Sequence, residues 1–371
     1  MTIKIPVSRP SIGEEELDAV KSVFESGWLG LGSVVYDFEN ALKEYLGAKN
    51  VIAVNTGTSA LHIALDGAGI GKGDEVIVPS LTFAATIQAI IAVGAVPVFC
   101  DIEANTLNID TAEVKRRITS KTKVIMPVHY CGNPCDMESL TAIAQEHNLT
   151  IIEDAAHGFG STYKGAKIGS VGDITCFSFD PIKTITCGEG GAVVLNNNEI
   201  AEEIRRKRIL GIDKDSWYRY KNEKLWFYEV TTRGYRYHMS NISAAIGLVQ
   251  LKKVDTFIEK KRAISRRYDE AFAKMGGIKT LDIDYRDTAP FTYIVRAGER
   301  RDELMEYMAA KGIDTGVHYI PNHIHPLFKE YASSLPVTEK VWREIITLPL
   351  YYDMSEKDID KVIEGIAQFF S

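Results

Sequence analysis

Cysteine is scarce in this chain of 371 residues, and its scarcity limits the cellular compartments in which we expect the protein. An odd set of five widely spaced cysteines excludes the disulfide framework of a small secreted protein and favours the cytoplasm. Two of them, with His129 close by, are spaced like one half of a zinc site, but no second pair follows. We therefore expect buried or partly buried thiols and no metal. The cysteines are Cys100, Cys131, Cys135, Cys176 and Cys187.

The chain also lacks an excess of basic charge. Lysine and arginine together number 43, against 50 aspartates and glutamates, which gives a formal net charge of −7. The one tight basic run, residues 205–208, directly follows Glu202 and Glu203, so we expect it to form a solvated helix face. These features exclude the basic footprint of a nucleic-acid-binding protein.

One long stretch has no charge at all, yet it does not fit a membrane span. Val76 to Cys100 is long enough to cross a bilayer. Pro79, Gly94 and Pro97 interrupt it, and its pattern indicates a strand, a loop, a buried helix and a second strand. Residues 1–4 lead into no apolar segment, so no signal peptide is expected.

Strand and helix signals alternate along the first two thirds of the chain. Short apolar runs that suit strands buried on both faces lie at 51–54, 76–79, 96–99, 123–128 and 150–154. The helical segments between them predict an α/β domain with a mostly parallel sheet. A long charged helical stretch begins at Lys252, and the alternation then becomes sparse. We expect a large α/β domain over residues 1–250 and a small α+β domain over 251–371.

Two polar segments follow predicted strands, where ligands of open α/β sheets bind. The loop 56–59 offers hydroxyls and backbone N–H groups at a helix N-terminus, which favour a phosphate. Thr58 or Ser59 acting as an ordinary N-cap explains the same residues equally well. Asp154 ends a strand and His157 follows three residues later, which suits either a ligand-binding carboxylate or a plain hydrogen-bonded turn.

Lys183 is the strongest candidate for a reactive group. It lies among apolar and hydroxyl residues and is followed by the glycine-rich segment 188–191. A lysine held away from bulk water has a lowered pKa, and its neutral amine can attack a carbonyl. A lysine that extends from a loop into solvent, with the glycines forming a hairpin turn, is the alternative.

These segments resemble, in order and spacing, the sugar aminotransferases of the fold-type I pyridoxal-phosphate superfamily, often called the DegT/DnrJ/StrS family. The resemblance covers nearly the whole chain. It implies the aspartate-aminotransferase-like α/β fold, with a large domain built on a mostly parallel sheet and a small C-terminal α+β domain. The seven motifs are Asn55–Leu61, Pro79–Phe83, Glu153–His157, Ser178–Lys183, Gly188–Gly191, Gly234–Asn241 and His318–His323.

The resemblance implies roles around a bound pyridoxal 5′-phosphate. Lys183 would hold the cofactor covalently and then move a proton as the catalytic residue. Asp154 would keep the ring nitrogen protonated, which makes the ring an electron sink. Phe83 would stack on the ring, with core packing as its alternative, and His157 would contact the ring or its 3′-oxygen.

Other residues would hold the phosphate. Thr58, Ser59 and Ser178 would do so from the same subunit. In the family the partner subunit reaches the phosphate from the segment that corresponds to 237–241. Family members often have Asn or Arg where this chain has His238, so either His238 or Asn241 would make this contact across a homodimer.

The last motif implies which residues bind the substrate. His318, Tyr319 and His323 would bind the sugar or its diphosphate, with a structural turn as the alternative reading. Asp180 stands where the family more often has His, Tyr or Asn, and an acid there would change the charge near the sugar.

The implied function is transfer of an amino group from glutamate to a nucleotide-linked keto sugar, through the pyridoxamine phosphate form of the cofactor. The best guess at the substrate is dTDP-4-keto-6-deoxy-D-glucose, for a surface polysaccharide such as the lipopolysaccharide O-antigen. A 3-keto sugar is an alternative. A sugar dehydratase and a non-catalytic regulatory protein on the same scaffold are alternatives of other classes.

Overall fold

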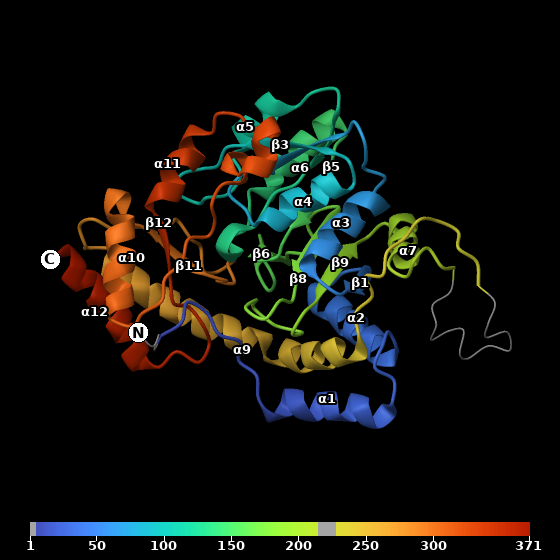
Figure 1. The fold of residues 1–371 in the computed structure, drawn as a ribbon, viewed down its shortest axis with the longest axis horizontal. Coiled ribbons are helices and arrows are strands. Elements are labelled where there is room, and N and C mark those ends of the chain that lie inside the picture. The colour runs from blue at the N-terminus through green and yellow to red at the C-terminus, as the bar shows by residue number, and fades with distance from the viewer. Residues whose placement is uncertain (1–4, 214–227) are drawn as a thin grey trace.

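The centre of the molecule is a seven-stranded sheet (Figure 1), in a computed structural model that describes residues 5–213 and 228–371. Five neighbouring strands of this sheet pair in parallel, which gives four parallel pairs side by side. One strand, β9, runs antiparallel to both of its neighbours. In order across the sheet the strands are β1 (Asn50–Val54), β9 (Gly191–Leu195), β8 (Ile174–Ser178), β5 (Thr150–Asp154), β4 (Thr122–Ile125), β2 (Glu75–Pro79) and β3 (Val96–Cys100).

Helices cover both faces of this sheet because each strand is apolar on both sides. Alternate residues of β1 show the division: Ile52 packs in one core and Val51 in the other. One face carries α3 (Gly57–Gly67), α4 (Ala84–Ala92) and α7 (Asn198–Lys207). The opposite face carries α2 (Ser33–Leu46), α5 (Thr111–Arg117) and α6 (Met137–His147). A short hairpin pairs β6 (Thr162–Tyr163) with β7 (Ala166–Lys167).

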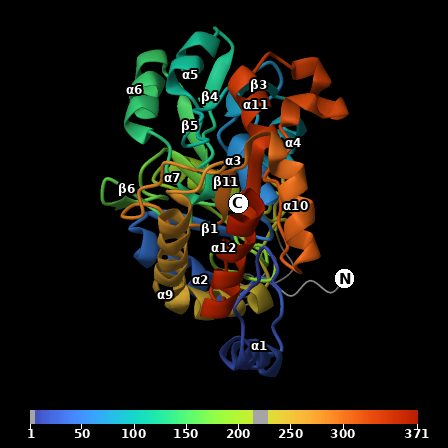
Figure 2. The same ribbon diagram turned by 90° about the vertical axis from the view of Figure 1, so that its left-hand side faces the viewer.

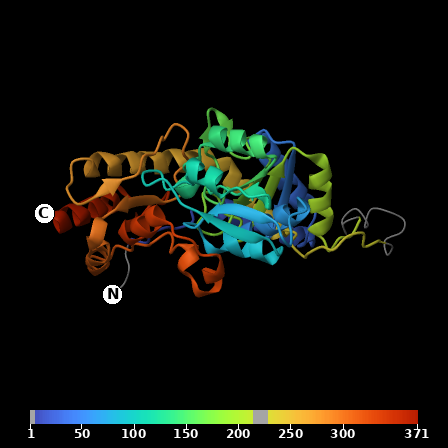
Figure 3. The same ribbon diagram turned by 90° about the horizontal axis from the view of Figure 1, so that it is seen from above.

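The C-terminal part forms a second, smaller body at the other end of the long axis (Figure 3). Its antiparallel sheet has the order β10 (Lys279–Thr280), β11 (Tyr293–Arg296) and β12 (Ile345–Leu348). Residues of α10 (Arg301–Ala310) and α12 (Glu356–Phe370) share its core. The N-terminal segment joins this body as well, because Ile5 is buried there and pairs with Ile313.

The long helix α9 (Asn241–Phe272) connects the two bodies. Its Ala244 and Val254 lie in the core beneath α2, whereas its Ile264 and Tyr268 lie in the C-terminal core. Helix α1 (Glu14–Ser26) packs along the outer side of α9, as Figures 1 and 2 show. Because α9 continues unbroken through residue 250, the division at that residue stays a prediction.

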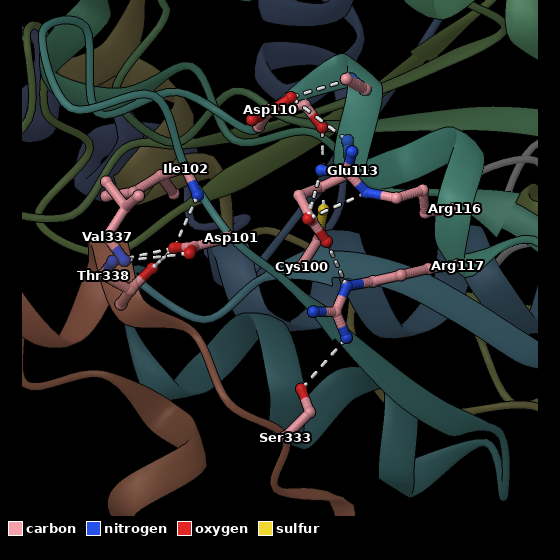
Figure 4. A network of polar contacts seen from close by, with 11 residues as sticks. Cys100, Asp101, Ile102, Asp110, Glu113, Arg116, Arg117, Ser333, Val337 and Thr338 are labelled. Carbon is pink, nitrogen blue, oxygen red and sulfur yellow. Dashed lines mark hydrogen bonds and ion pairs between the residues drawn. The ribbon is translucent and has the colours of Figure 1, made fainter.

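A buried carboxylate fastens the C-terminal body to the sheet (Figure 4). Asp101 directly follows β3 and is 5% exposed. It accepts hydrogen bonds from the backbone N–H groups of Val337 and Thr338 and from the Thr338 hydroxyl, at 2.7–3.0 Å. It thereby holds the first turn of α11 (Pro336–Glu344), where unpaired N–H groups and the helix dipole favour a negative charge.

Several expectations about local structure are confirmed. The uncharged stretch Val76–Cys100 is divided into β2, α4 and β3. No helix in the described ranges has the length and apolar composition to span a membrane. All five cysteines are buried with free thiols. Cys135 donates a hydrogen bond to the Val128 carbonyl, and Cys131 accepts one from Thr292, so the two sulfurs have separate partners.

The expectation of a solvated basic face at residues 205–208 is wrong for its last two residues. Lys207 is 9% exposed, and its amine lies 2.8 Å from Asp66. Arg208 is 2% exposed and is paired with Glu39. The local pattern of charges did not reveal these acids, which come from distant helices.

Candidate active site

A cavity of about 330 Å³ lies where strands β5 and β8 end and helices α3 and α4 begin. The ends of parallel strands and the starts of the following helices meet there, as they do at ligand sites of open α/β sheets. The C-terminal body closes it with two residues. Of the predicted site residues, those that line it are Thr58, Phe83, Asp154, His157, Ser178, Asp180, Lys183, His318 and Tyr319.

The start of α3 forms a polar cradle in this cavity. The N-cap is Thr56, whose Oγ1 accepts the Ser59 backbone N–H at 3.0 Å, so the expectation that Thr58 or Ser59 is the cap is wrong. Thr58 is exposed to the cavity, whereas the buried Ser59 hydroxyl donates to Asn55 at 2.7 Å. Ser59 therefore lies behind the lining.

Glycine is required in that cradle. A Cβ atom on Gly57 would lie 2.7 Å from Cβ of Ser178 and 2.9 Å from its Oγ, closer than real Cβ atoms approach. The missing side chain lets the first turn of α3 and the end of β8 touch. Gly57, Thr58 and Ser178 consequently line one cavity at a helix N-terminus, a place that favours anions.

Asp154 carries a buried carboxylate at the end of β5. It is 4% exposed, and its Oδ2 accepts a hydrogen bond of 2.7 Å from Thr86 Oγ1. Its Oδ1 accepts one of 3.1 Å from the Ala156 backbone N–H, so the predicted turn bond exists beside the cavity. Burial raises the pKa of Asp154, while these donors and nearby Lys183 act in the opposite direction. A cation in the cavity would stabilise its charged form.

Lys183 reaches the cavity from the turn after β8. Its backbone N–H donates to the Asp180 carbonyl at 3.1 Å, and its Nζ lies 4.3 Å from the centre of the Phe291 ring. Burial lowers the pKa of Lys183 to about 8, although the charges of Asp154 and Asp180 favour its protonated form. A large share of this amine is neutral near pH 8 and able to attack a carbonyl. The alternative of a solvent-extended lysine does not hold.

His157 forms one wall with two aromatic residues. Its ring stacks on Phe291 with 4.2 Å between centroids, and its Nε2 lies 3.0 Å from the Tyr319 hydroxyl. Burial, with Lys183 nearby, keeps the pKa of His157 well below its ordinary value, so the ring is neutral. Its Nδ1 is buried without a hydrogen-bond partner in the described structure.

His318 and Phe83 complete the wall on the substrate side. His318 is bonded through Nδ1 to Thr347 Oγ1 at 2.8 Å, and burial lowers its pKa to about 4. Phe83 is 59% exposed, which excludes core packing, and its ring centre lies 5.6 Å from that of Tyr319. An open aromatic face is thus presented to a planar ligand.

Two acids stand at the mouth. Asp180 Oδ1 accepts the Ile182 backbone N–H at 3.1 Å. Glu189 lines the cavity from the glycine-rich segment, and burial together with Asp180 raises its pKa. The lining therefore carries Glu189 in addition to Asp180, the acid that we expected near the sugar.

His323 does not reach the cavity. It is 5% exposed, and its Nδ1 lies 2.7 Å from the Ser80 hydroxyl, away from the lining. Its neighbour Asn322 is fully buried and donates to the backbone carbonyls of Ser80 and Thr82 at 3.1 and 2.7 Å. Asn322 and His323 therefore hold the loop before Phe83 in place. For these two residues, the interpretation as a structural turn fits better than contact with the substrate.

His238 and Asn241 also lie outside the cavity. Asn241 is 2% exposed, and its side-chain amide bonds the Val35 N–H and the Trp28 carbonyl. It is thus engaged within its own subunit. His238 pairs with Val54 at the end of β1, and its Nδ1 is buried without a partner in the described structure. Contact of His238 with a neighbouring subunit stays a prediction.

Sequence reasoning missed Thr86, Glu189, Phe291 and Asn322. Thr86 lies three residues after the predicted ring-stacking Phe83, which is one helical turn, so spacing alone was a usable signal. Glu189 stood inside a quoted motif. Nothing local marks Phe291, because it meets His157 and Lys183 only through the fold.

Comparison with known proteins gives consistent matches. The model of the DegT/DnrJ/EryC1/StrS aminotransferase family matches residues 10–367. The chain is 41% identical to the spore coat polysaccharide biosynthesis protein SpsC of Bacillus subtilis (strain 168) over 373 residues. That alignment covers 98% of this chain and 96% of the relative.

Solved structures of similar proteins have nearly the same fold. The putative sugar aminotransferase Spr1654 from Streptococcus pneumoniae, in its PMP form, superposes with a TM-score of 0.93 at 31% identity and 98% coverage of each chain. The same protein has also been solved in an apo form and a PLP form. DesV of S. venezuelae, in complex with a ketimine intermediate, superposes with a TM-score of 0.90 at 33% identity, covering 96% of this chain and 95% of that one.

Proposed function

The chain belongs to the DegT/DnrJ/EryC1/StrS aminotransferase family, and on that premise we propose that it transfers an amino group from glutamate to a nucleotide-linked keto sugar. It is a PLP-dependent sugar aminotransferase with the fold-type I architecture. The finer proposal is the substrate, dTDP-4-keto-6-deoxy-D-glucose, with a 4-amino-4,6-dideoxyhexose for a surface polysaccharide as the product. Likeness to a spore coat polysaccharide protein supports that use.

The residues of the cavity fit pyridoxal 5′-phosphate. The cradle of Thr58 and Ser178, which a side chain on Gly57 would fill, suits the phosphate. The buried carboxylate of Asp154 suits a protonated ring nitrogen, and His157 lines the same cavity. When bound, the cofactor supplies an aldehyde for the amine of the donor and a ring that accepts electrons from the donor's α-carbon.

The protein's own side chains hold the cofactor, move the proton and orient the sugar. Lys183 would hold the cofactor through its neutral amine, with the aldehyde oxygen leaving as water, and its freed amine would carry the proton that leaves the donor's α-carbon. Asp154, held by Thr86 and Ala156, would supply the negative charge that stabilises a protonated ring nitrogen. The wall of Phe83, His318 and Tyr319 orients the sugar and limits the entry of water.

The observation that carries this proposal is the meeting of Lys183 and Asp154 in one cavity. The first has a pKa of about 8, which makes it a nucleophile near neutral pH. The second is a buried carboxylate that gains from a cationic partner. A reactive amine beside a charge-stabilising acid is the arrangement that pyridoxal chemistry requires.

We further propose a homodimer in the cytoplasm that shares its active sites. Leu17 and Phe24 of α1 are each 60% exposed, and apolar side chains exposed in this way suit a subunit interface. The side chain of His238 is partly exposed, which suits a contact with a neighbour's phosphate. If so, a one-to-one mixture of Lys183→Ala and His238→Ala chains should regain about a quarter of wild-type turnover, because half of the dimers are mixed and each holds one intact site.

The test of function is a panel of dTDP-, UDP- and GDP-linked keto sugars, with the keto group at C3 or C4. The full chain with cofactor and glutamate should yield the aminated 4-keto sugar, detected by mass spectrometry, and Lys183→Ala should yield none. Amination of a 3-keto sugar would overturn the finer proposal. Loss of water without gain of nitrogen would indicate a dehydratase, and an unchanged cofactor spectrum with glutamate a regulatory protein.

A further inference from the structure

Two carboxylates of the active-site cavity are placed by the end of the β8–β9 ladder. These strands pair antiparallel over their whole length, and one residue beyond them the Phe179 N–H donates to the Gly190 carbonyl at 2.8 Å. Asp180 and Glu189 are the next residues on the two chain segments, and both line the cavity. Two acids that are nine residues apart in the sequence thus come to neighbouring positions in the fold.

Neither of these acids is neutralised by a base. Asp180 is fixed by the turn after β8, because its Oδ1 accepts the Ile182 backbone N–H and its carbonyl accepts that of Lys183, both at 3.1 Å. Within residues 5–213 and 228–371, no lysine, arginine or histidine forms an ion pair with Asp180 or Glu189. Burial and the charge of Asp180 raise the pKa of Glu189, as expected for an acid near a like charge.

The other charged groups that line the cavity serve the cofactor. In the described part of the chain these are Asp154 and Lys183, and no arginine belongs to the lining. Burial keeps the pKa values of His157 and His318 low, so both rings are neutral. The sugar ring would therefore meet aromatic, hydroxyl and imidazole groups together with two negative charges, and no free positive charge of this subunit.

We propose that Asp180 and Glu189 determine the class of sugar that the enzyme accepts, a ring without negative charge, and that they exclude uronic acids. A carboxylate oxygen accepts a hydrogen bond from a sugar hydroxyl. An ionised carboxylate on the sugar has no proton to donate, and it would add a like charge to the cavity. The proposal rests on the function proposed above and narrows its substrate class.

The test compares two ligands that differ in one group. In dTDP-glucose C5 carries a hydroxymethyl group, and in dTDP-glucuronic acid it carries a carboxylate. The diphosphate is common to both and cancels from the ratio of their dissociation constants, which isothermal titration calorimetry measures on the full chain loaded with pyridoxamine phosphate. The corresponding UDP sugars are measured in parallel. The wild type should bind the glucose ligand at least about 10-fold more tightly, and added salt should reduce this preference by screening the repulsion.

Isosteric variants separate charge from shape. Asp180→Asn keeps an oxygen for the Ile182 N–H, and Glu189→Gln keeps the size of an exposed side chain. In the double variant the two dissociation constants should come within about threefold of each other. Each single variant should lose part of the preference, which keeps the test valid if the double variant fails to fold by circular dichroism. Glu306→Gln, exposed on α10 outside the lining, removes one charge and should keep the wild-type ratio.

Equal affinity of the wild type for the two ligands would overturn the proposal. A preference that the charge-removing variants retain would also overturn it, because shape would then be the cause. An equal loss in Glu306→Gln would assign the effect to the net charge of the protein and would overturn it too. If no nucleotide sugar binds, the proposed function fails and this inference with it, whereas binding with the wrong ratio contradicts this inference alone.

Discussion

The two walls of the active-site cavity are built differently. On the sheet side, Asp154 and Ser178 each stand at the last position of a strand, and register with neighbouring strands fixes them. On the side of the C-terminal body, His318 and Tyr319 lie on a segment without regular structure. Asn322 and His323 fasten that segment by bonds to Ser80 and Thr82.

This difference in construction gives the two walls different tasks. Backbone ladders hold Asp154 and Ser178, so the geometry of these two residues depends little on any single side chain. Side-chain bonds hold the substrate wall, so its geometry depends on a few buried polar residues. Substitutions in the first wall should consequently affect cofactor chemistry, and substitutions in the second should affect sugar affinity or stability.

The largest effect is expected at Asp154. Asp154→Asn removes the negative charge but can still accept the Thr86 hydrogen bond, so the fold should persist. The rate of the half-reaction with glutamate, followed by the absorbance of the cofactor, should fall about 10²–10⁴-fold. Asp180→Asn, at the mouth, is the matched control and should lose less than about 10-fold. A rate for Asp154→Asn within tenfold of wild type would contradict the division of tasks.

Gly57 tests the cradle on the same wall. In Gly57→Ala the new methyl group meets Ser178 at 2.7 Å, and the turn must move away from the end of β8. Cofactor affinity, measured by fluorescence titration, should weaken by up to about 10²-fold, since a displacement near 1 Å has effects of that size. Gly276→Ala, which has no atoms within 4 Å of the new methyl, should bind cofactor normally. Normal affinity in Gly57→Ala would show that the cradle does not hold the phosphate.

His318 tests the second wall. His318→Ala should raise KM for the keto sugar about 10-fold, the size of one lost hydrogen bond to a substrate, and should leave the glutamate half-reaction unchanged. Because the pKa of His318 is about 4, the histidine is neutral above pH 5 and should contribute no limb to the pH profile there. His325→Ala, on the same segment but outside the lining, is the control. An equal loss in both half-reactions would erase the distinction between the walls.

Asn322 should have the smallest effect on chemistry. Asn322→Ala removes the side-chain donor from the Thr82 carbonyl and one of the two Asn322 donors from the Ser80 carbonyl, which should destabilise the protein by about 1–3 kcal/mol in urea unfolding. Turnover at saturating sugar should stay within about threefold, because Asn322 does not itself line the cavity. A strong loss of turnover with unchanged stability would move Asn322 into the catalytic wall.

The reliability of sequence-based prediction differed in the same way between the walls. Asp154 ends a strand whose apolar run is visible in the sequence, and Ser178 and Lys183 belong to one motif. The structure brings all three into one cavity. His318 and His323 belong to one motif, yet only the first lines the cavity. The short helical turn Asn322–Ile324 directs His323 to Ser80, a contact between residues far apart in the chain.

The sequence by itself determined the alternation of strands and helices, the order of the motifs, and the residues able to do amine and phosphate chemistry. Only the tertiary structure decided which of these polar groups are satisfied internally, as Ser59, Asn241 and His323 are, and which face a ligand. It also brought Phe291 to Lys183. Hydrogen-bond partners and loss of water depend on residues distant in sequence, and these set the pKa values on which the chemistry rests.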